Sequence, residues 1–275
     1  MSVVNSLQKI DSWPVDNAAA AVVSADGEVL GTAGDQDRRF PLASVTKLLS
    51  AYTVLIALDE GALELDQPAG PEGSTVRHLL AHSGGYDFGE RTVRYTPGTR
   101  RLYSNAGFEV LGEKLEEATG IAFAEYMREG LLVPLGMAAT ALEGSPAAGA
   151  VSTVADLSRF AAELQSPVLT DPGRLEEASQ VVFPGLAGVL PGFGRQKEND
   201  WGLGFEIRDH KSPHWTGTNS SPKTFGHFGQ SGTFLWVDPD AQAAAVCLTD
   251  RDFGPWAAEA WPPFTDAVLA ELAGR

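Results

Sequence analysis

The most informative stretch of the chain spans residues 40–56 and reads Phe40-Pro41-Leu42-Ala43-Ser44-Val45-Thr46-Lys47-Leu48-Leu49-Ser50-Ala51-Tyr52-Thr53-Val54-Leu55-Ile56. Its apolar second half predicts a long buried helix that opens at Ser44 and ends near Gly61. Residues three apart lie on one face of a helix, so the Lys47 amine can reach the Ser44 hydroxyl. A serine is a weak nucleophile until a base takes its proton. The stretch therefore predicts an activated serine.

The same Ser-x-x-Lys spacing also occurs at Ser6 and at Ser220. Ser6 stands in an N-terminal segment without a long apolar continuation, and Ser220 lies among turn-forming residues that disfavour a helix. Only Ser44 opens a long apolar helix, and this context distinguishes it from the other two.

The composition is that of an enzyme-sized globule. The chain has 275 residues, of which 43% are apolar, enough for one large core or two smaller ones. No apolar run approaches the ~20 residues of a membrane span, and the N-terminus has no basic leader or long hydrophobic region. We therefore expect a cytoplasmic protein without a membrane partner.

The charge balance and the cysteine content exclude further classes. The formal net charge of −16 would repel phosphate backbones and anionic lipids, so no nucleic acid partner is expected. Cys247, the only cysteine, lies in an apolar strand pattern, which predicts a buried thiol and excludes an intramolecular disulfide.

Strand patterns occur at both ends of the chain and helical patterns in its middle. Strands are predicted at 18–24 and 28–33, joined by a hairpin at Asp26-Gly27, and at 202–208, 224–228, 232–237 and 243–249. Helices are predicted at 2–11, 75–82, 104–119, 121–130, 153–165 and 263–272.

This distribution predicts an α/β (α+β) fold with one antiparallel sheet built from both chain ends and flanked by helices. Residues 1–59 and 199–275 would form the discontinuous sheet domain, and residues 60–198 an inserted, mainly helical domain. We expect the active site in the cleft between the two domains.

A second candidate element is Tyr103-Ser104-Asn105. A phenol beside a lysine ammonium has its pKa lowered, which would make Tyr103 a proton acceptor. The amide of Asn105 could orient Lys47 or a substrate amide. In the alternative interpretation Tyr103 is merely packed in a loop and Asn105 caps a helix over 106–119.

A third element is the glycine-rich stretch 226–232, which contains His227, Phe228, Gly229 and Gln230 at a strand end. Small residues there let a substrate lie against the strand edge. His227 could then act on the bound group as a donor or a proton relay. The alternative is a histidine that is simply packed in its strand.

In this order, the three elements resemble the penicillin-recognising serine hydrolases, the group related to class C β-lactamases, DD-peptidases and family VIII-type serine esterases. The resemblance runs from about residue 17 to 255. It includes the segments 75–84, 110–112, 134–137, 149–157 and 236–239.

The resemblance implies a β-lactamase/transpeptidase-like fold and acyl transfer through a covalent serine ester. Ser44 would be the nucleophile, and Lys47 and Tyr103 would share the proton transfers, with the acylation base left open. The backbone N–H groups of Ser44 and of Gln230, just after Gly229, would hold the oxyanion. The resemblance further implies that Asn105, His227 and Phe228 bind or orient a small ester, amide or β-lactam, without any cofactor.

Departures from the family pattern affect the substrate. Many β-lactamases of this fold have Lys-Thr-Gly where this chain has His227-Phe228-Gly229. Phe228 offers no hydroxyl and a neutral His227 offers no full charge, so only weak β-lactamase activity is expected. Aromatic residues gather toward the C-terminal end of the chain: Trp201, Trp215, Phe225, Phe228 and Trp236. If these side chains line the cleft, they favour an ester substrate with an apolar group. In the alternative interpretation most of them belong to the core of the sheet.

The sequence also bears on two other function classes. His78 with His82, and His210 with His214, have the spacing of zinc ligands but lack the glutamate of a His-Glu-x-x-His helix, so no metal is expected. A noncatalytic penicillin-binding-like ligand-binding or sensor module is the alternative to a hydrolase. The polar catalytic positions are all present, which favours the hydrolase.

Overall fold

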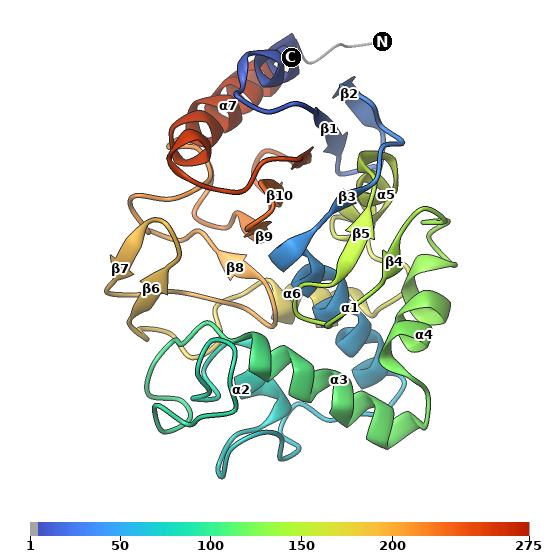
Figure 1. Cartoon of the computed structure of the whole chain (residues 1–275), viewed down its shortest axis with the longest axis vertical. Helices are drawn as coiled ribbons and strands as arrows, with labels where there is room; N and C mark the ends of the chain where they lie inside the picture. Colours follow the sequence, from blue (N-terminus) through green and yellow to red (C-terminus); the bar gives the residue numbers. More distant parts are fainter. Residues whose placement is uncertain (1–4, 275) are drawn as a thin grey trace.

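The computed structural model describes residues 5–274, and its centre is a six-stranded antiparallel sheet (Figure 1). The strand order is β2-β1-β11-β10-β9-β8. Strands β1 and β11 pair in full register, from Ala18 opposite Thr249 to Ser24 opposite Ala243. The predicted antiparallel sheet built from both chain ends is therefore confirmed. Its strands are β1 (Ala18–Ser24), β2 (Val29–Ala33), β8 (Glu206–Ile207), β9 (Phe225–Gly229), β10 (Thr233–Asp238) and β11 (Ala243–Thr249).

Helices cover both faces of this sheet. Successive side chains of a strand point to opposite faces. In β1, Ala20 and Val22 join the core under η1 (Asn5–Ser12) and α7 (Pro255–Ala273), whereas Val23 joins the core under α5 (Val154–Glu163). Cys247 is fully buried in β11, as predicted. Among residues 5–274, no helix is long and apolar enough to cross a membrane.

Helix α7 begins eight residues before its predicted start at 263. The sequence prediction placed its start at the prolines, but Pro262 and Pro263 lie inside the helix. Proline removes a backbone hydrogen bond and normally ends a helix. Here the flanking Trp261 and Phe264 are buried against the sheet, and this packing carries the helix through the two prolines.

The buried helix predicted from residue 44 exists, but its first turn differs. Residues Ala43–Val45 form a 3₁₀ turn (η2), and the α-helix α1 runs from Thr46 to Asp59. Every residue of α1 up to Leu58 is buried, so the prediction of a long buried helix is confirmed. Ser44 thus lies in the tight turn that leads into the helix, and Lys47 on its first turn.

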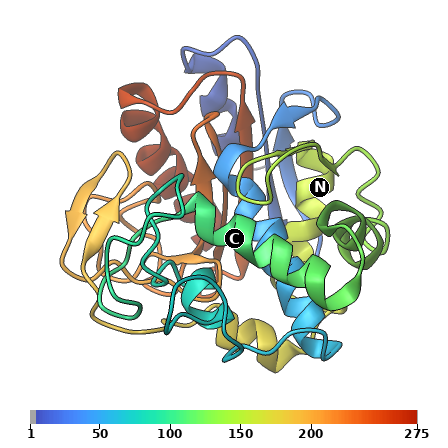
Figure 2. The same cartoon turned by 60° about the horizontal axis from the view of Figure 1, so that its bottom comes forward.

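The middle of the chain contains the predicted helices and several short elements that were not predicted. The predicted helices correspond to α2 (Val76–Leu80), α3 (Asn105–Thr119), α4 (Phe123–Met127) with a π-helical turn η3 (Arg128–Leu132), and α5. Figure 2 shows α3 lying across α1, which it contacts. The elements not predicted are α6 (Pro172–Ala178), the small sheet β3 (Phe40–Pro41), β5 (Ala150–Ser152) and β4 (Ala141–Leu142), and the hairpin β6 (Gly188–Leu190) and β7 (Gly194–Gln196). The domain boundaries at 60 and 198 remain a prediction.

Candidate active site

The turn that carries Ser44 is held between the central sheet and the small sheet. Ala43 has a φ of 44°, an unusual value for a residue with a side chain. The hydroxyl of Ser231 donates to the Pro41 carbonyl at 2.7 Å, and that of Thr233 donates to the Leu42 carbonyl at 2.9 Å. These bonds hold the turn against the ends of β9 and β10, with Ser44 half-buried.

Lys47 is fully buried, and its amine has three polar neighbours. The Nζ atom lies 2.6 Å from Asn105 Oδ1, 2.9 Å from the Ala147 carbonyl oxygen and 3.5 Å from Ser44 Oγ. Burial holds the pKa of Lys47 well below its ordinary value, although Glu109 opposes the shift. A neutral amine has two N–H groups and one lone pair. If both N–H groups point to the Asn105 and Ala147 oxygens, a neutral Lys47 keeps one lone pair, and Ser44 Oγ is the third polar atom near it.

Tyr103 contacts the same hydroxyl from the other side. Its phenol oxygen lies 2.7 Å from Ser44 Oγ. The prediction that a lysine ammonium lowers the pKa of Tyr103 was wrong, because burial raises it more than the Ser44 hydrogen bond lowers it. In addition, the Lys47 amine lies over the Tyr103 ring, 4.6 Å from its centroid. Tyr103 is therefore a protonated donor at neutral pH.

The start of α3 positions Asn105. The Ser104 hydroxyl caps this helix by accepting from the Gly107 N–H at 3.1 Å. Asn105 is the first helical residue, so its side chain is not used as a cap and is available to Lys47. The structure thus brings Ser44, Lys47, Tyr103 and Asn105 into one hydrogen-bonded group.

His227 lies on β9 next to this group, and its ring is 5.5 Å from that of Tyr103. Its Nδ1 atom lies 2.6 Å from the Phe228 carbonyl oxygen. Because a carbonyl only accepts, Nδ1 carries the hydrogen and the buried Nε2 presents a lone pair. Burial, with a contribution from Lys47, lowers the pKa of His227 to about 3. The side chain is therefore a neutral acceptor.

Gly229 allows β9 to approach the Ser44 turn closely. A Cβ at this position would lie 2.3 Å from the Leu42 carbonyl oxygen, 2.5 Å from Thr233 Oγ1 and 3.2 Å from the Ser44 nitrogen. The side chain of the next residue, Gln230, turns away and donates to the Phe253 carbonyl at 3.3 Å. Only the backbone of Gln230 is therefore available to the site.

The expectation that Phe228 binds or orients the substrate was wrong. Neighbouring strand residues point to opposite faces, and Phe228 joins the core under α7, with its ring 4.8 Å from Phe253 and 5.9 Å from Trp261. The other late aromatic residues, Trp215, Phe225 and Trp236, are also buried in the two cores of the sheet. Trp201 is buried as well but belongs to neither core, and its ring lies 5.8 Å from that of Tyr103.

Two residues that were not predicted as site residues shape the segment leading to Tyr103. His82 Nδ1 accepts from the Ser104 N–H at 3.1 Å, and its ring lies 4.6 Å from that of Tyr103. Arg101 is buried, and its guanidinium donates only to backbone carbonyls, those of Ala81, Val182, Phe183 and Asn199. His82 belongs to the family-like segment 75–84, which could have pointed to it. Nothing local in the sequence marks Arg101.

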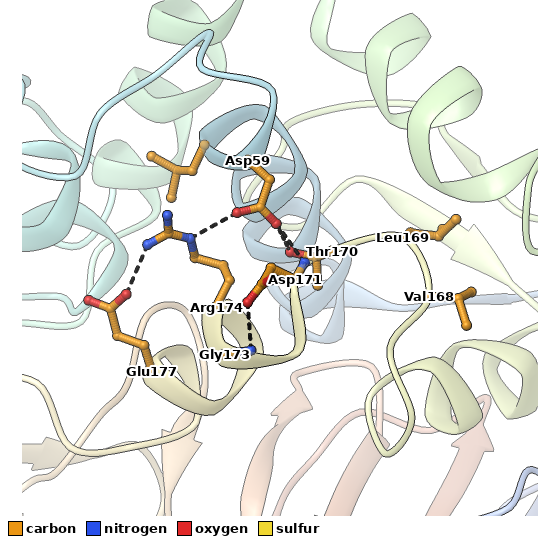
Figure 3. Close-up of a pocket in the computed structure, with 9 residues that line it drawn as sticks. Asp59, Val168, Leu169, Thr170, Asp171, Gly173, Arg174 and Glu177 are labelled. Carbon is orange, nitrogen blue, oxygen red and sulfur yellow. Dashed lines mark hydrogen bonds and ion pairs between the residues drawn. The ribbon is translucent and has the colours of Figure 1, made fainter.

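A cavity of about 780 Å³ lies at the opposite end of α1 (Figure 3). Asp59, the last residue of α1, follows Ser44 by 15 positions, which corresponds to about 22 Å of helix. The Arg174 guanidinium pairs with Asp59 at 3.1 Å and with Glu177 at 2.9 Å, and Asp59 also accepts from Thr170. These polar groups satisfy one another and fix α6 to α1, so the cavity has no connection with the Ser44 chemistry.

The fold and the grouped serine, lysine and tyrosine define a β-lactamase/transpeptidase-like protein with the arrangement of a serine hydrolase. The chain belongs to the beta-lactamase family, whose model matches residues 16–270. The predicted resemblance and the predicted fold class are confirmed.

Relatives of this chain have several different activities in their names. A solved structure described as a β-lactamase from Mycobacterium bovis is 54% identical, with a TM-score of 0.96 over 98% of this chain and 99% of that one. A structure described as a hydrolase with promiscuous acyltransferase activity shares the fold at 18% identity, with a TM-score of 0.78 over 96% of each chain. A protein of Escherichia coli O157:H7, provisionally named a D-alanyl-D-alanine carboxypeptidase, is 24% identical over 59% of this chain and 48% of its own length. The chain thus spans about half the length of the curated relatives it matches.

Proposed function

We propose that this protein is a serine hydrolase that cleaves an ester or amide bond through an acyl-enzyme on Ser44, with esters as the better substrates. The observation that carries the proposal is the pair of contacts on the Ser44 hydroxyl, 2.7 Å from the Tyr103 phenol and 3.5 Å from the Lys47 amine. A nucleophile with a base and a donor in reach is the arrangement that acyl transfer requires.

The lowered pKa of Lys47 and the raised pKa of Tyr103 support Lys47 as the acylation base. Tyr103 is protonated and donates to Ser44 Oγ, so the serine proton is directed toward the Lys47 lone pair. Ser44 Oγ then bonds to the substrate carbonyl carbon as Lys47 takes the proton. When the bond to the leaving group breaks, the Tyr103 hydroxyl gives that group a proton and is reprotonated from Lys47. Such acid–base assistance contributes typically 10²–10⁴ in rate.

The oxyanion would be held by the backbone N–H groups of Ser44 and Gln230. The close approach of Gly229 to the Ser44 nitrogen supports this assignment, because it brings the end of β9 beside the turn. One such donor is worth roughly 3 kcal/mol. Water would then bond to the acyl carbon while its proton passes through Tyr103 to Lys47, and the bond from that carbon to Ser44 Oγ would break as Lys47 returns the proton to the serine. The lone pair of His227 Nε2 offers that water an acceptor.

The donors around the site favour esters over β-lactams. The neutral His227 provides no positive charge for a β-lactam carboxylate, and Phe228 points into the core. A β-lactamase is the second candidate, and the name of the M. bovis relative favours it. The Escherichia coli relative makes a D-peptide amide a third substrate to test.

Two measurements test the proposal. Short p-nitrophenyl esters should turn over faster than a chromogenic cephalosporin or a D-alanyl-D-alanine peptide, and Ser44→Ala should abolish turnover. A faster cephalosporin would make the second candidate correct. Labelling with a fluorophosphonate addresses the noncatalytic alternative. An unlabelled parent protein, or equal labelling of Ser44→Ala, would support a binding or sensor module instead.

A further inference from the structure

A cavity of about 630 Å³ is lined by Tyr103, by the segment leading to it and by residues of the hairpin β6–β7. The two walls are tied together by a bridge between Arg101 and Gly188 and by the bond from the Arg101 N–H to the Ala187 carbonyl at 3.0 Å. Tyr103 forms part of the lining and its phenol oxygen lies 2.7 Å from Ser44 Oγ, so the cavity and the Ser44 group share this residue.

The cavity is positively charged in a protein of net charge −16. Arg100 and Arg195 line it, both are exposed, and within residues 5–274 neither forms an ion pair with a carboxylate. Nearby arginines of the same loop behave differently, because Arg91 pairs with Glu113 and Arg94 with Asp87. The described lining contains no acidic side chain. In the described part of the chain, the two guanidinium groups that line the cavity thus have no carboxylate partner.

The rim of the same cavity is apolar. Phe88, Tyr95 and Val189 line it with 54%, 44% and 59% of their surfaces exposed. They are three of the eight large apolar side chains that the described part of the chain exposes, so this surface is concentrated at one place. The Arg100 guanidinium lies 5.4 Å from the Tyr95 ring centroid, and this contact keeps the cation at the rim.

We infer that this cavity is a subsite for an apolar chain that ends in a carboxylate, so the preferred substrate is a monoanionic ester or amide of amphipathic character. Apolar side chains contact the body of the group, and Arg100 and Arg195 bind its carboxylate by charge-assisted hydrogen bonds. Arg101 takes no part, since its donors are used by backbone carbonyls. The inference rests on the proposed hydrolase function for the reacting end of the substrate.

Two esters of equal length test the inference. The p-nitrophenyl monoester of adipic acid carries the carboxylate, and p-nitrophenyl hexanoate lacks it. Wild type should prefer the adipate ester, and Arg100→Met or Arg195→Met should each lower the ratio of the two kcat/KM values about tenfold, mainly through KM. High salt should reduce the preference. Lys197→Met removes an exposed cation that does not line the cavity and should leave the ratio at its wild-type value.

A ratio that neither arginine variant changes, or that Lys197→Met lowers equally, would overturn the subsite. Failure of the hydrolase function would look different, because neither ester would then show Ser44-dependent turnover. Binding to the Ser44→Ala protein separates the two cases without turnover. By calorimetry, adipic acid monoamide should bind more tightly than hexanamide, and Arg195→Met in this background should reduce the difference about tenfold. Equal binding of the two amides would overturn the inference.

Discussion

Replacing Asn105 by aspartate tests the protonation state of Lys47 with almost no change of shape. The Asn105 Oδ1 atom lies 2.6 Å from Lys47 Nζ. A carboxylate at this distance would stabilise the ammonium by at most about 6 kcal/mol at an effective dielectric constant of ~20. The carboxylate also loses hydration when it is half-buried, so we expect the pKa of Lys47 to rise by about 1–3 units, as for other close pairs.

The expected result is a displaced pH profile rather than a uniform loss. In Asn105→Asp the acidic limb of kcat/KM for a p-nitrophenyl ester should move upward by ~1–3 units, with activity recovered at higher pH. Asn105→Leu is the matched control, because it removes the acceptor without adding charge and should lower activity without the upward displacement. The reasoning is refuted if Asn105→Asp loses activity equally at every pH.

Three further outcomes are expected. Gly229→Ala should lower stability by about 1–3 kcal/mol and kcat by ~10²-fold, because the added Cβ collides with the Leu42 carbonyl oxygen. Gly130→Ala, whose Cβ would make only ordinary contacts, should change neither. Equal urea midpoints and equal kcat values for the two variants would contradict this. Burial depresses the pKa of Lys47 in the folded state, so the contribution of Lys47 to stability is complete only above its unfolded pKa of about 10.4 and is lost as pH falls. Lys47→Met should therefore raise the free energy of unfolding at pH 7, by an amount that shrinks toward pH 10. A difference between the two proteins that does not change with pH would count against a depressed pKa. Arg101→Met should lower the free energy of urea unfolding by about 3 kcal/mol, because it leaves backbone carbonyls without donors. Arg100→Met should stay within about 0.5 kcal/mol of the wild-type value. Similar losses for both variants would show that the carbonyl contacts are unimportant.

Local geometry explains why part of the site was predictable. The three-residue spacing from Ser44 to Lys47 brings the lysine amine near the serine hydroxyl, even though the turn that contains Ser44 is 3₁₀ rather than α-helical. Tyr103 and Asn105 lie 59 and 58 residues from their partners in the chain, and the family resemblance was needed to favour their functional interpretation over the structural one. Their contacts are tertiary, and no local pattern encodes them.

The errors concern burial and side-chain direction. The direction of the Tyr103 pKa shift depends on how deeply the phenol is buried and on where the Lys47 amine lies over its ring, and neither is visible in the sequence. The side of the sheet on which Phe228 lies follows from the pairing of β9 with β10, where Phe228 is opposite Phe234. A shift of one residue would have turned it toward the site.

In the fold, the long elements were predictable from the sequence and the shortest ones were not. Long strands such as Ala243–Thr249 and the buried helix Thr46–Asp59 have enough residues to show a clear pattern. The two-residue strands Phe40–Pro41 and Ala141–Leu142 have no periodicity of their own and form through pairing with Ala150–Ser152. The chain location of these small elements could not be predicted, although they support the Ser44 turn.

Acid-quenched mass spectrometry during turnover of a p-nitrophenyl ester measures the central claim most directly. The acyl group should add its mass to the tryptic peptide Phe40–Lys47, which contains Ser44. The adduct should be absent from Ser44→Ala and should form far more slowly in Lys47→Met. Turnover without an acylated peptide, or an adduct on any residue other than Ser44, would contradict the account.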